Sequence, residues 1–226
     1  MPENTPQKTA GTDPQQAALD AARQVIRHQG EGLIAAADDV DSSFLSTVAL
    51  LMRTRSAGGK VFVSGAGTSG AVARRMAHLL SVSGTPSLFM PPADALHGTM
   101  AAMTAGDVLI AISKGGSSQE INDLVVRAKE RGVESVIAVT SNPNSPLAAE
   151  SEIVVTLTNL PGIDPGEVIA MGSTLVTAAW GDALATVLMR LSGYRWSEVL
   201  HSHPSGAVGQ LDDAPDELAP LAPFWD

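Results

Sequence analysis

Hydrophobic positions are spaced in two different ways along the chain. Before about residue 58 they recur every three or four residues, which predicts two helices, the second capped by Asp41 or Ser42. From Lys60 onward, short apolar runs alternate with helical stretches, the pattern of βαβ units in a parallel sheet. The predicted strands are Val61–Val63, Ser87–Met90, Val108–Ile112, Ser135–Val139 and Ile153–Leu157.

Glycines mark the ends of the helices between these strands. Gly84 and Gly132 are placed as C-terminal stops of the helices that follow the first and third strands, and Gly193 closes a last helix over about Ser173–Leu191. Five strands with covering helices predict an α/β fold, a three-layer, doubly wound five-stranded parallel sheet with an N-terminal helical lead-in.

Length and composition indicate one globular domain with additional segments at its ends. The chain has 226 residues, of which 44% are hydrophobic, enough to bury one sizeable core. We expect residues 1–13, rich in Pro, Thr and Gln, to be disordered, and residues 14–58 to form the helical lead-in. The sheet domain then spans 59–210, and 211–226 form an acidic, extended tail.

Charge and composition restrict the partners of the chain. A formal net charge of −10 and a pI near 4.8 argue against nucleic acid or an anionic membrane, which need clustered Lys and Arg. A small anion remains compatible, because amides at a helix start bind phosphate whatever the net charge. Cysteine is missing, the start does not resemble a secretory signal, and no stretch approaches the roughly 18 uncharged apolar residues of a membrane span. We therefore expect a cytoplasmic protein.

A glycine-rich segment, Ser64–Gly70, follows the first predicted strand and opens a helix. Its glycines permit close backbone approach, and the following amides and hydroxyls face an anion at the positive end of the helix dipole. Its three glycines also have the spacing of a dinucleotide-binding turn, but the second strand runs into Pro91 and Pro92, and Asp94 is the nearest acid for a ribose. Phosphate binding, nucleotide binding and a purely structural turn are all compatible with this segment.

A second polar loop, Ser113–Glu120, follows the third predicted strand. It brings three hydroxyls, two glycines and a lysine to a strand-to-helix junction, which makes a second candidate anion site. Ligands of open parallel sheets bind at the carboxyl ends of the strands, so we expect the two loops to act together. Glu120 is either part of this site or an ordinary first-turn acid that favours the helix dipole.

From Val61 to Gly209 the chain resembles the sugar isomerase (SIS) domain, and within that family it is most similar to the arabinose-5-phosphate isomerases. The matching pieces are VSGAGTSG, SGTPS, LHGTM, DVLIAIS, SSQEI, VTSNPNSPLA, GDALA and HPSGAVG. The resemblance implies a flavodoxin-like domain that binds a sugar phosphate, in a homo-oligomer (a dimer or tetramer) with sites near subunit contacts. It also implies an aldose–ketose isomerase, here without the regulatory CBS domains that usually follow.

By motif, the resemblance assigns proton transfer to one glutamate and two histidines. Glu120 falls on the family's catalytic glutamate, His203 in HPSGAVG on its catalytic histidine, and His97 in LHGTM on a histidine near the sugar. The expected phosphate-binding residues are Gly67, Thr68, Ser69, Ser113, Lys114, Ser117 and Ser118.

The chain also departs from the family pattern. Isomerases of this subfamily usually have a lysine where this chain has Thr68, and Lys114 could return that positive charge to the site. A further family glutamate aligns closest to Gly162, and Asp164 or Glu167 could replace it only if the loop is shifted.

Aldose–ketose isomerisation moves a proton between adjacent carbons through an enediol and needs an acid or base for the ring and oxygens. We assign the carbon proton to Glu120 and the oxygen protons to His203, since histidine titrates near ~6.5, although the roles could be exchanged. The five histidines form no i, i+4 pair beside an acid, so we expect neither a metal nor another cofactor. The alternative function is a noncatalytic phosphosugar sensor or regulatory module, which the departures at Thr68 and Gly162 would permit.

Overall fold

The computed structural model of the chain describes residues 13–211 and 213–225. Within these residues the sheet has five strands, all parallel, in the order β2-β1-β3-β4-β5. The predicted parallel sheet is confirmed, and the strand boundaries agree with the predicted ones to within two residues. The strands are β1 (Val61–Gly65), β2 (Ser87–Phe89), β3 (Val108–Ile112), β4 (Ser135–Thr140) and β5 (Ile153–Thr156).

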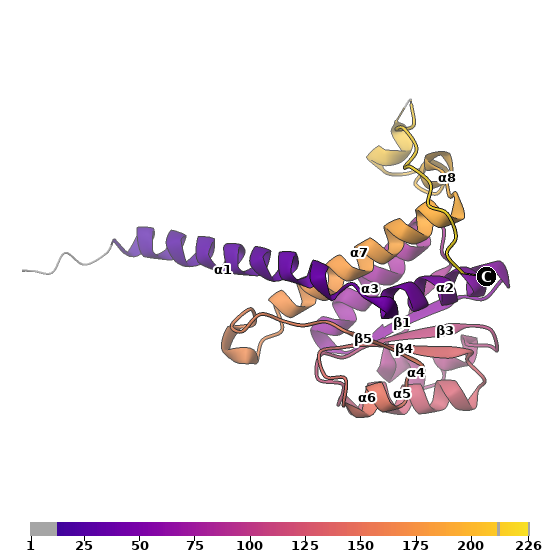
Figure 1. Cartoon of the computed structure of the whole chain (residues 1–226), viewed down its shortest axis with the longest axis horizontal. Helices are drawn as coiled ribbons and strands as arrows, with labels where there is room; N and C mark the ends of the chain where they lie inside the picture. Colours follow the sequence, from indigo (N-terminus) through magenta and orange to yellow (C-terminus); the bar gives the residue numbers. More distant parts are fainter. Residues whose placement is uncertain (1–12, 212, 226) are drawn as a thin grey trace, which may run out of the picture.

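Helices cover both faces of the sheet and make the expected three layers (Figure 1). The core on one face is formed with α2, α3 and α7, and the core on the other with α4, α5 and α6. The longer helices are α1 (Pro14–Ala36), α2 (Ser42–Ser56), α3 (Gly67–Val82), α5 (Gln119–Glu130) and α7 (Gly172–Ser192). Short helices are α4 (Pro92–Leu96), α6 (Pro146–Ala149) and α8 (Trp196–His201), with 3₁₀ turns at Ala37–Asp39, Thr99–Ala102, Pro165–Glu167 and Ala207–Gln210.

The alternation of side chains along β3 shows why both cores are apolar. Val108, Ile110 and Ile112 point into the core with α3 and α7, whereas Leu109 and Ala111 point into the core with α5. All five residues are at most 3% exposed. Strands buried on both faces need continuous apolar runs, which is the pattern that made them recognisable in the sequence.

The strand order contains one reversal, and this reversal determines where loops converge. The chain runs outward from β1 to β2, then returns to β3 on the other side of β1 and continues through β4 to β5. The loops that leave β1 and β3 at their carboxyl ends therefore diverge to opposite faces of the sheet. A crevice opens between them, at the position where doubly wound sheets bind ligands.

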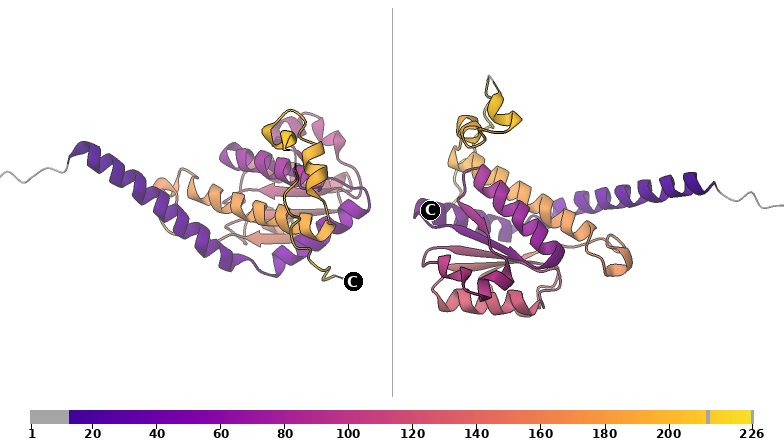
Figure 2. Two further views of the ribbon diagram at one scale, coloured as in Figure 1. Left: turned by 90° about the horizontal axis from the view of Figure 1, so that it is seen from above. Right: turned by 180° about the vertical axis from the view of Figure 1, so that it is seen from behind.

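Helix α1 extends beyond the sheet domain, and its N-terminal part projects away from the other elements (Figure 2). Asp13 caps it by accepting a hydrogen bond from the Gln15 amide at 3.1 Å. Several of its apolar side chains remain in solvent, among them Ile26 at 69% and Ile34 at 76% exposure. Most of the predicted disordered start, residues 1–12, lies outside the described residues. None of the described helices is long and apolar enough to cross a bilayer.

The C-terminal segment from residue 213 has no helix or strand, as expected for an extended tail, but it lies on the body of the molecule. Arg190 Nε donates to the Ala219 carbonyl at 2.7 Å, and the Leu221 amide donates to the Arg190 carbonyl at 3.4 Å. Trp225 packs against the core that contains α2 and α7. These contacts tie the tail to α7.

Substituting one helical glycine should test the close packing of α3 on β1. A Cβ on Gly70 would lie 2.7 Å from the Gly65 carbonyl oxygen, so Gly70→Ala should lower the free energy of unfolding by about 1–3 kcal/mol. The matched control is Gly30→Ala in α1, where no atom lies within 4 Å and better helix propensity should stabilise by about 0.5–1 kcal/mol. Urea denaturation of both variants measures the difference; equal effects would contradict the packing argument.

Candidate functional site

The turn between β1 and α3 forms one wall of the crevice. Cβ atoms on Gly65 or Gly70 would each lie 2.7 Å from backbone atoms of the other side of the turn, so these glycines allow the helix to start against the strand. Gly67 has φ +56°, a conformation that suits glycine. Gly67 and Thr68 are exposed and Ser69 is half-buried, and of these three residues Ser69 lines the pocket described below.

The loop between β3 and α5 forms the opposite wall and presents two facing hydroxyls. Ser113 Oγ lies 3.3 Å from Ser118 Oγ and also accepts a hydrogen bond from the Gly116 amide at 3.1 Å. Ser118 is the N-cap residue of α5, yet its side chain makes no capping bond. Its hydroxyl is instead turned toward Ser113. Ser117 is exposed, and its hydroxyl donates to the Gly115 carbonyl at 3.4 Å.

This loop is held rigidly by the end of β4. The Lys114 carbonyl accepts hydrogen bonds from the Ser141 amide at 2.9 Å and from Thr140 Oγ1 at 3.0 Å. Gly116 has φ +66°, and a Cβ there would lie 2.0 Å from Ser145 Oγ. The backbone that carries the hydroxyl pair is therefore fixed before any ligand arrives.

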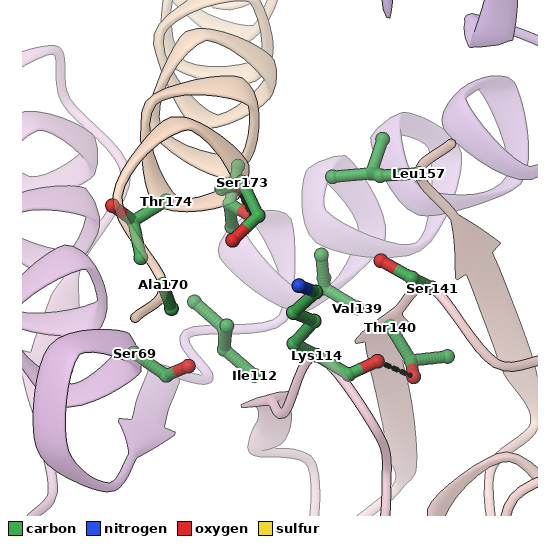
Figure 3. A pocket seen from close by; sticks show the side chains of 11 residues that line it. Ser69, Ile112, Lys114, Val139, Thr140, Ser141, Leu157, Ala170, Ser173 and Thr174 are labelled. Carbon is green, nitrogen blue, oxygen red and sulfur yellow. Dashed lines mark hydrogen bonds between the residues drawn. The ribbon is translucent and has the colours of Figure 1, made fainter. Parts of the chain in front are cut away.

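A small pocket lies between these loops and the start of α7 (Figure 3). Water-sized groups can occupy about 20 Å³ of it, which is room for one or two water molecules. Most of its polar lining consists of hydroxyls. The lining residues are Ser69, Ile112, Lys114, Val139, Thr140, Ser141, Leu157, Ala170, Ser173, Thr174 and Thr177.

The Lys114 side chain crosses this pocket to a buried carboxylate. Its Nζ lies 2.6 Å from Asp164 Oδ2 and 4.0 Å from Glu167 Oε2. The other oxygen of Asp164 accepts hydrogen bonds from the amides of Met171 at 2.7 Å and Ser173 at 3.0 Å. Burial opposes ionisation of Asp164, but the Lys114 ammonium, the Ser173 side chain and these amides outweigh it and lower the pKa to about 2. Asp164 is therefore ionised at neutral pH.

The predicted catalytic residues are placed in three different surroundings. Glu120 is exposed in the first turn of α5, next to the hydroxyl loop, and it makes no hydrogen bond or ion pair with another described residue. His97 is exposed directly after α4 and does not line the pocket. His203 follows α8, where its Nδ1 lies 2.8 Å from the Val199 carbonyl oxygen.

His203 is not brought to the pocket of its own chain. The pocket adjoins the start of α7, whereas α8 and His203 follow its end, and 21 helical residues span about 30 Å. Figure 1 shows α8 at the end of α7 that is remote from the loop between β5 and α7. Within one chain, His203 and the pocket therefore lie near opposite ends of α7.

Sequence reasoning missed part of the pocket. Ser173, Thr174 and Thr177 line it from the first turns of α7 and were read as parts of an apolar helix. Asp164 had been considered as a substitute for the family glutamate; instead it binds Lys114 and the start of α7. A signal for them was available in the sequence, because hydroxyl side chains cluster at the beginning of a helix that follows a strand. Among the described residues, no group of three or more His, Asp or Glu side chains is arranged to hold a metal ion.

The loop between β5 and α7, which carries Asp164, is fastened to α1. His28 Nε2 lies 2.9 Å from the Pro161 carbonyl oxygen, and His28 Nδ1 lies 3.3 Å from Glu31. The Ile163 side chain packs so closely on Gly32 that a Cβ there would lie 2.2 Å from it. The Pro161 carbonyl and then Glu31 raise the pKa of His28, because they favour a ring that donates from both nitrogens.

Comparison with known proteins shows similarity to one family and to several of its curated members. The family model of the SIS domain matches residues 55–187. Arabinose 5-phosphate isomerase KdsD of Pseudomonas aeruginosa is 34% identical over 192 residues, which cover 85% of this chain and 58% of that protein. Arabinose 5-phosphate isomerase KpsF of Escherichia coli is 35% identical over 193 residues, covering 85% and 60% respectively. The chain thus spans about 60% of the length of these curated relatives.

Among solved structures, the E. coli CFT073 protein c3406, in complex with arabinose 5-phosphate, superimposes with a TM-score of 0.80 at 25% identity. The alignment covers 85% of this chain and all of that one. This similarity agrees with the flavodoxin-like strand order and with the crevice between β1 and β3.

Protonation of His28 should strengthen its contact with the loop before α7. A group with a raised folded-state pKa stabilises fully below its unfolded pKa, near ~6.5, and loses this contribution as the pH rises through the folded pKa. Urea denaturation should therefore show a larger loss of unfolding free energy for His28→Gln at pH 5.5 than at pH 8.5. His78→Gln, an exposed histidine of α3, is the control and should show no such difference. An equal loss at both pH values would contradict the role of the proton.

Proposed function

Because the chain belongs to the SIS domain family, we propose that it is a phosphosugar isomerase that interconverts an aldose phosphate and a ketose phosphate. Arabinose 5-phosphate is the first candidate substrate, since it is the substrate named for the relatives KdsD and KpsF. The observation that carries the proposal is the convergence of two hydroxyl-bearing loops beside the free carboxylate of Glu120 at the strand-order reversal. Such a site can bind a phosphate and place a base beside the sugar carbons. Location in the cytoplasm stays a prediction from the sequence.

The phosphate is proposed to bind to the two loops. Ser113 and Ser118 offer hydroxyls 3.3 Å apart on a rigid backbone, with Ser117 next to them. Across the crevice, the first turn of α3 offers the hydroxyls of Thr68 and Ser69 and the unpaired amides, including that of Gly67, that every helix start has. These neutral donors explain how a chain of net charge −10 can hold an anion.

Glu120 is proposed to transfer the carbon proton. With the aldose in its open form, its carboxylate removes the proton from C2, which gives an enediol, and returns the proton to C1 as the ketose forms. The proton on the C2 oxygen moves to the C1 oxygen in the same conversion. Two features support this role: Glu120 lies two residues after Ser118 in the first turn of α5, and its carboxylate forms no hydrogen bond or ion pair with another described residue.

His203 is proposed to act in the site of a second copy. It lies at the far end of α7 from its own pocket, so the oxygen-proton step requires a histidine from elsewhere. Exposed apolar side chains on α1 (Ile26 and Ile34) and before α7 (Val168, 84% exposed) support assembly into a homo-oligomer, a dimer or a tetramer. His97, exposed after α4, is proposed to contact the sugar across the same contact between copies.

One observation favours the alternative, a noncatalytic phosphosugar sensor. Gly162 stands where the family has a second glutamate, and Glu167 does not replace it. The Glu167 carboxylate instead accepts a hydrogen bond from the Gly162 amide at 2.6 Å, and its side chain is 60% exposed. Asp164 is likewise engaged with Lys114 and α7.

Solvent deuterium exchange tests the isomerase. In deuterated water, the parent protein should incorporate deuterium at C1 or C2 of arabinose 5-phosphate or of another pentose or hexose phosphate in a panel. Glu120→Gln should lower the exchange rate by about 10²–10⁴-fold, the range for loss of a general base. Glu134→Gln, which alters an exposed side chain before β4 at the other end of the sheet, is the matched control and should exchange normally.

Other outcomes distinguish the alternatives. If calorimetry shows binding of a sugar phosphate but no deuterium is incorporated, the noncatalytic sensor is the function that remains. Stabilisation of the fold by a nicotinamide dinucleotide, with no response to sugar phosphates, would favour nucleotide binding at Ser64–Gly70 instead. Neither binding nor exchange would refute the phosphosugar function.

Mixing two inactive variants should restore activity if copies share a site. Glu120→Gln and His203→Ala should each be inactive alone, but an equimolar mixture refolded together should recover roughly a quarter of the parental rate for a dimer with shared sites. In such a mixture, half of the dimers are hybrids, and one of the two sites in each hybrid has both residues. No recovery, despite exchange of subunits, would place His203 outside the site.

A further inference from the structure

The ion pair of Lys114 and Asp164 lies in the pocket beside the proposed phosphate loops, and its role there rests on the proposed function. Asp164 is completely buried, and both of its oxygens have partners: Lys114 on one side, and the amides of Met171 and Ser173 on the other. A single carboxylate therefore fixes both a lysine from the β3 loop and the beginning of α7. Taking two charges out of water is costly, so such a pair is weak evidence for stability alone.

The surroundings of Lys114 make it a poor partner for a phosphate dianion. Its positive charge is matched by Asp164 at 2.6 Å, and Glu167 adds a second negative charge at 4.0 Å. A phosphate drawn to this ammonium would also approach both carboxylates. The hydroxyl pair on Ser113 and Ser118 carries no such penalty, which separates a phosphate end of the site from the lysine end.

The pocket has the size of a sugar oxygen. About 20 Å³ are open to water-sized groups, which is room for a hydroxyl or carbonyl oxygen and is small for a whole phosphoryl group. Ser173 lines this space and is 95% buried, and its Oγ, which lies near the Asp164 carboxylate, has no other hydrogen-bond partner among the described residues. A buried hydroxyl without a partner costs free energy unless a ligand supplies one. Figure 3 shows the Lys114 ammonium pointing toward Ser173.

We propose that Lys114 and Ser173 bind an oxygen at the reacting end of the open-chain sugar phosphate, and that Asp164 is the positioning residue that holds both. The ammonium has three N–H donors, one of which donates a hydrogen bond to Asp164, so another can donate to the ligand. As the enediol forms, negative charge develops on the C1 or C2 oxygen, and a donor fixed in advance stabilises that charge. In this proposal, the positive charge of Lys114 acts on the sugar and not on the phosphate.

Two variants test this division. Lys114→Met removes the donor; Asp164→Asn retains an oxygen for the Met171 and Ser173 amides but breaks the ion pair. We expect kcat to fall by about 10²-fold for Lys114→Met and at least about tenfold for Asp164→Asn, with KM within about threefold of the parent. By calorimetry, both variants should bind arabinonate 5-phosphate, whose C1 carboxylate carries negative charge at the reacting end, at least about tenfold more weakly, yet bind inorganic phosphate as the parent does.

The matched control is a second ion pair with nearly the same burial. Lys60 pairs with the buried Asp107 at 3.0 Å at the amino end of the sheet, and the exposures of the two lysines are 37% and 34%. Lys60→Met should lower stability without changing kcat or either affinity. The double variant Lys114→Met/Asp164→Asn carries no unpaired buried charge, so it should refold with parental circular dichroism and remain impaired in turnover.

Each contrary result is decisive. An equal loss of affinity for inorganic phosphate and for arabinonate 5-phosphate would return Lys114 to the phosphate end, and unchanged turnover in the well-folded double variant would remove the pair from the reaction. If the parent binds both probes but shows no proton exchange, the isomerase proposal fails while the difference between the two affinities still decides the role of Lys114. If the parent binds neither probe, both proposals fail.

Discussion

Burial of the sheet on both faces determines where polar chemistry can lie in this molecule. Every strand position of β1 and β3 is buried, and the two cores above and below them are built from apolar side chains. Polar groups inside such a layer need partners, which leaves the ends of the strands for hydroxyls and charges. The reversal of strand order between β1 and β3 then concentrates the serine-rich loops in one crevice.

The two buried carboxylates of the sheet domain illustrate structural and functional uses of the same chemistry. Asp107, at the amino end, accepts bonds from the amides of Lys60 and Thr104, from Thr104 Oγ1 and from the Lys60 ammonium, so it closes the turn before β3. Asp164, at the carboxyl end, also has all its donors, but its lysine borders an open pocket with an unpaired Ser173 hydroxyl. The two sites therefore differ in the open space beside the ion pair and not in the ion pair itself.

How much the sequence could predict follows from the range of the interactions involved. The strands, the Asp41 cap and the left-handed Gly193 at the end of α7 were predictable, because apolar runs and helix ends depend on neighbouring residues. The same local signals placed the two polar loops correctly at the carboxyl ends of β1 and β3, whereas phosphate binding by these loops stays a proposal. The partnership of Lys114 with Asp164 joins residues 50 positions apart across two strands, which no local pattern encodes. The place of His203 depends on the direction of the 21-residue α7, and the packing of Trp225 depends on tertiary contacts of the tail.

A neutral ion pair is well suited to an oxygen whose charge changes during a reaction. A free lysine would attract the phosphate dianion strongly and gain nothing specific for the transition state. Lys114 compensated by Asp164 has little net charge at a distance, so it adds little to binding of the ground state, yet its ammonium is already aimed at the pocket. When negative charge appears on the enclosed oxygen, the nearby ammonium stabilises it more than the carboxylate behind destabilises it, because Coulomb energy falls with distance. Interactions that strengthen only as charge develops raise the rate rather than the affinity. In the proposed mechanism, the buried Asp164 thus gives an acidic protein a way to use a lysine at the sugar while neutral amides and hydroxyls hold the phosphate.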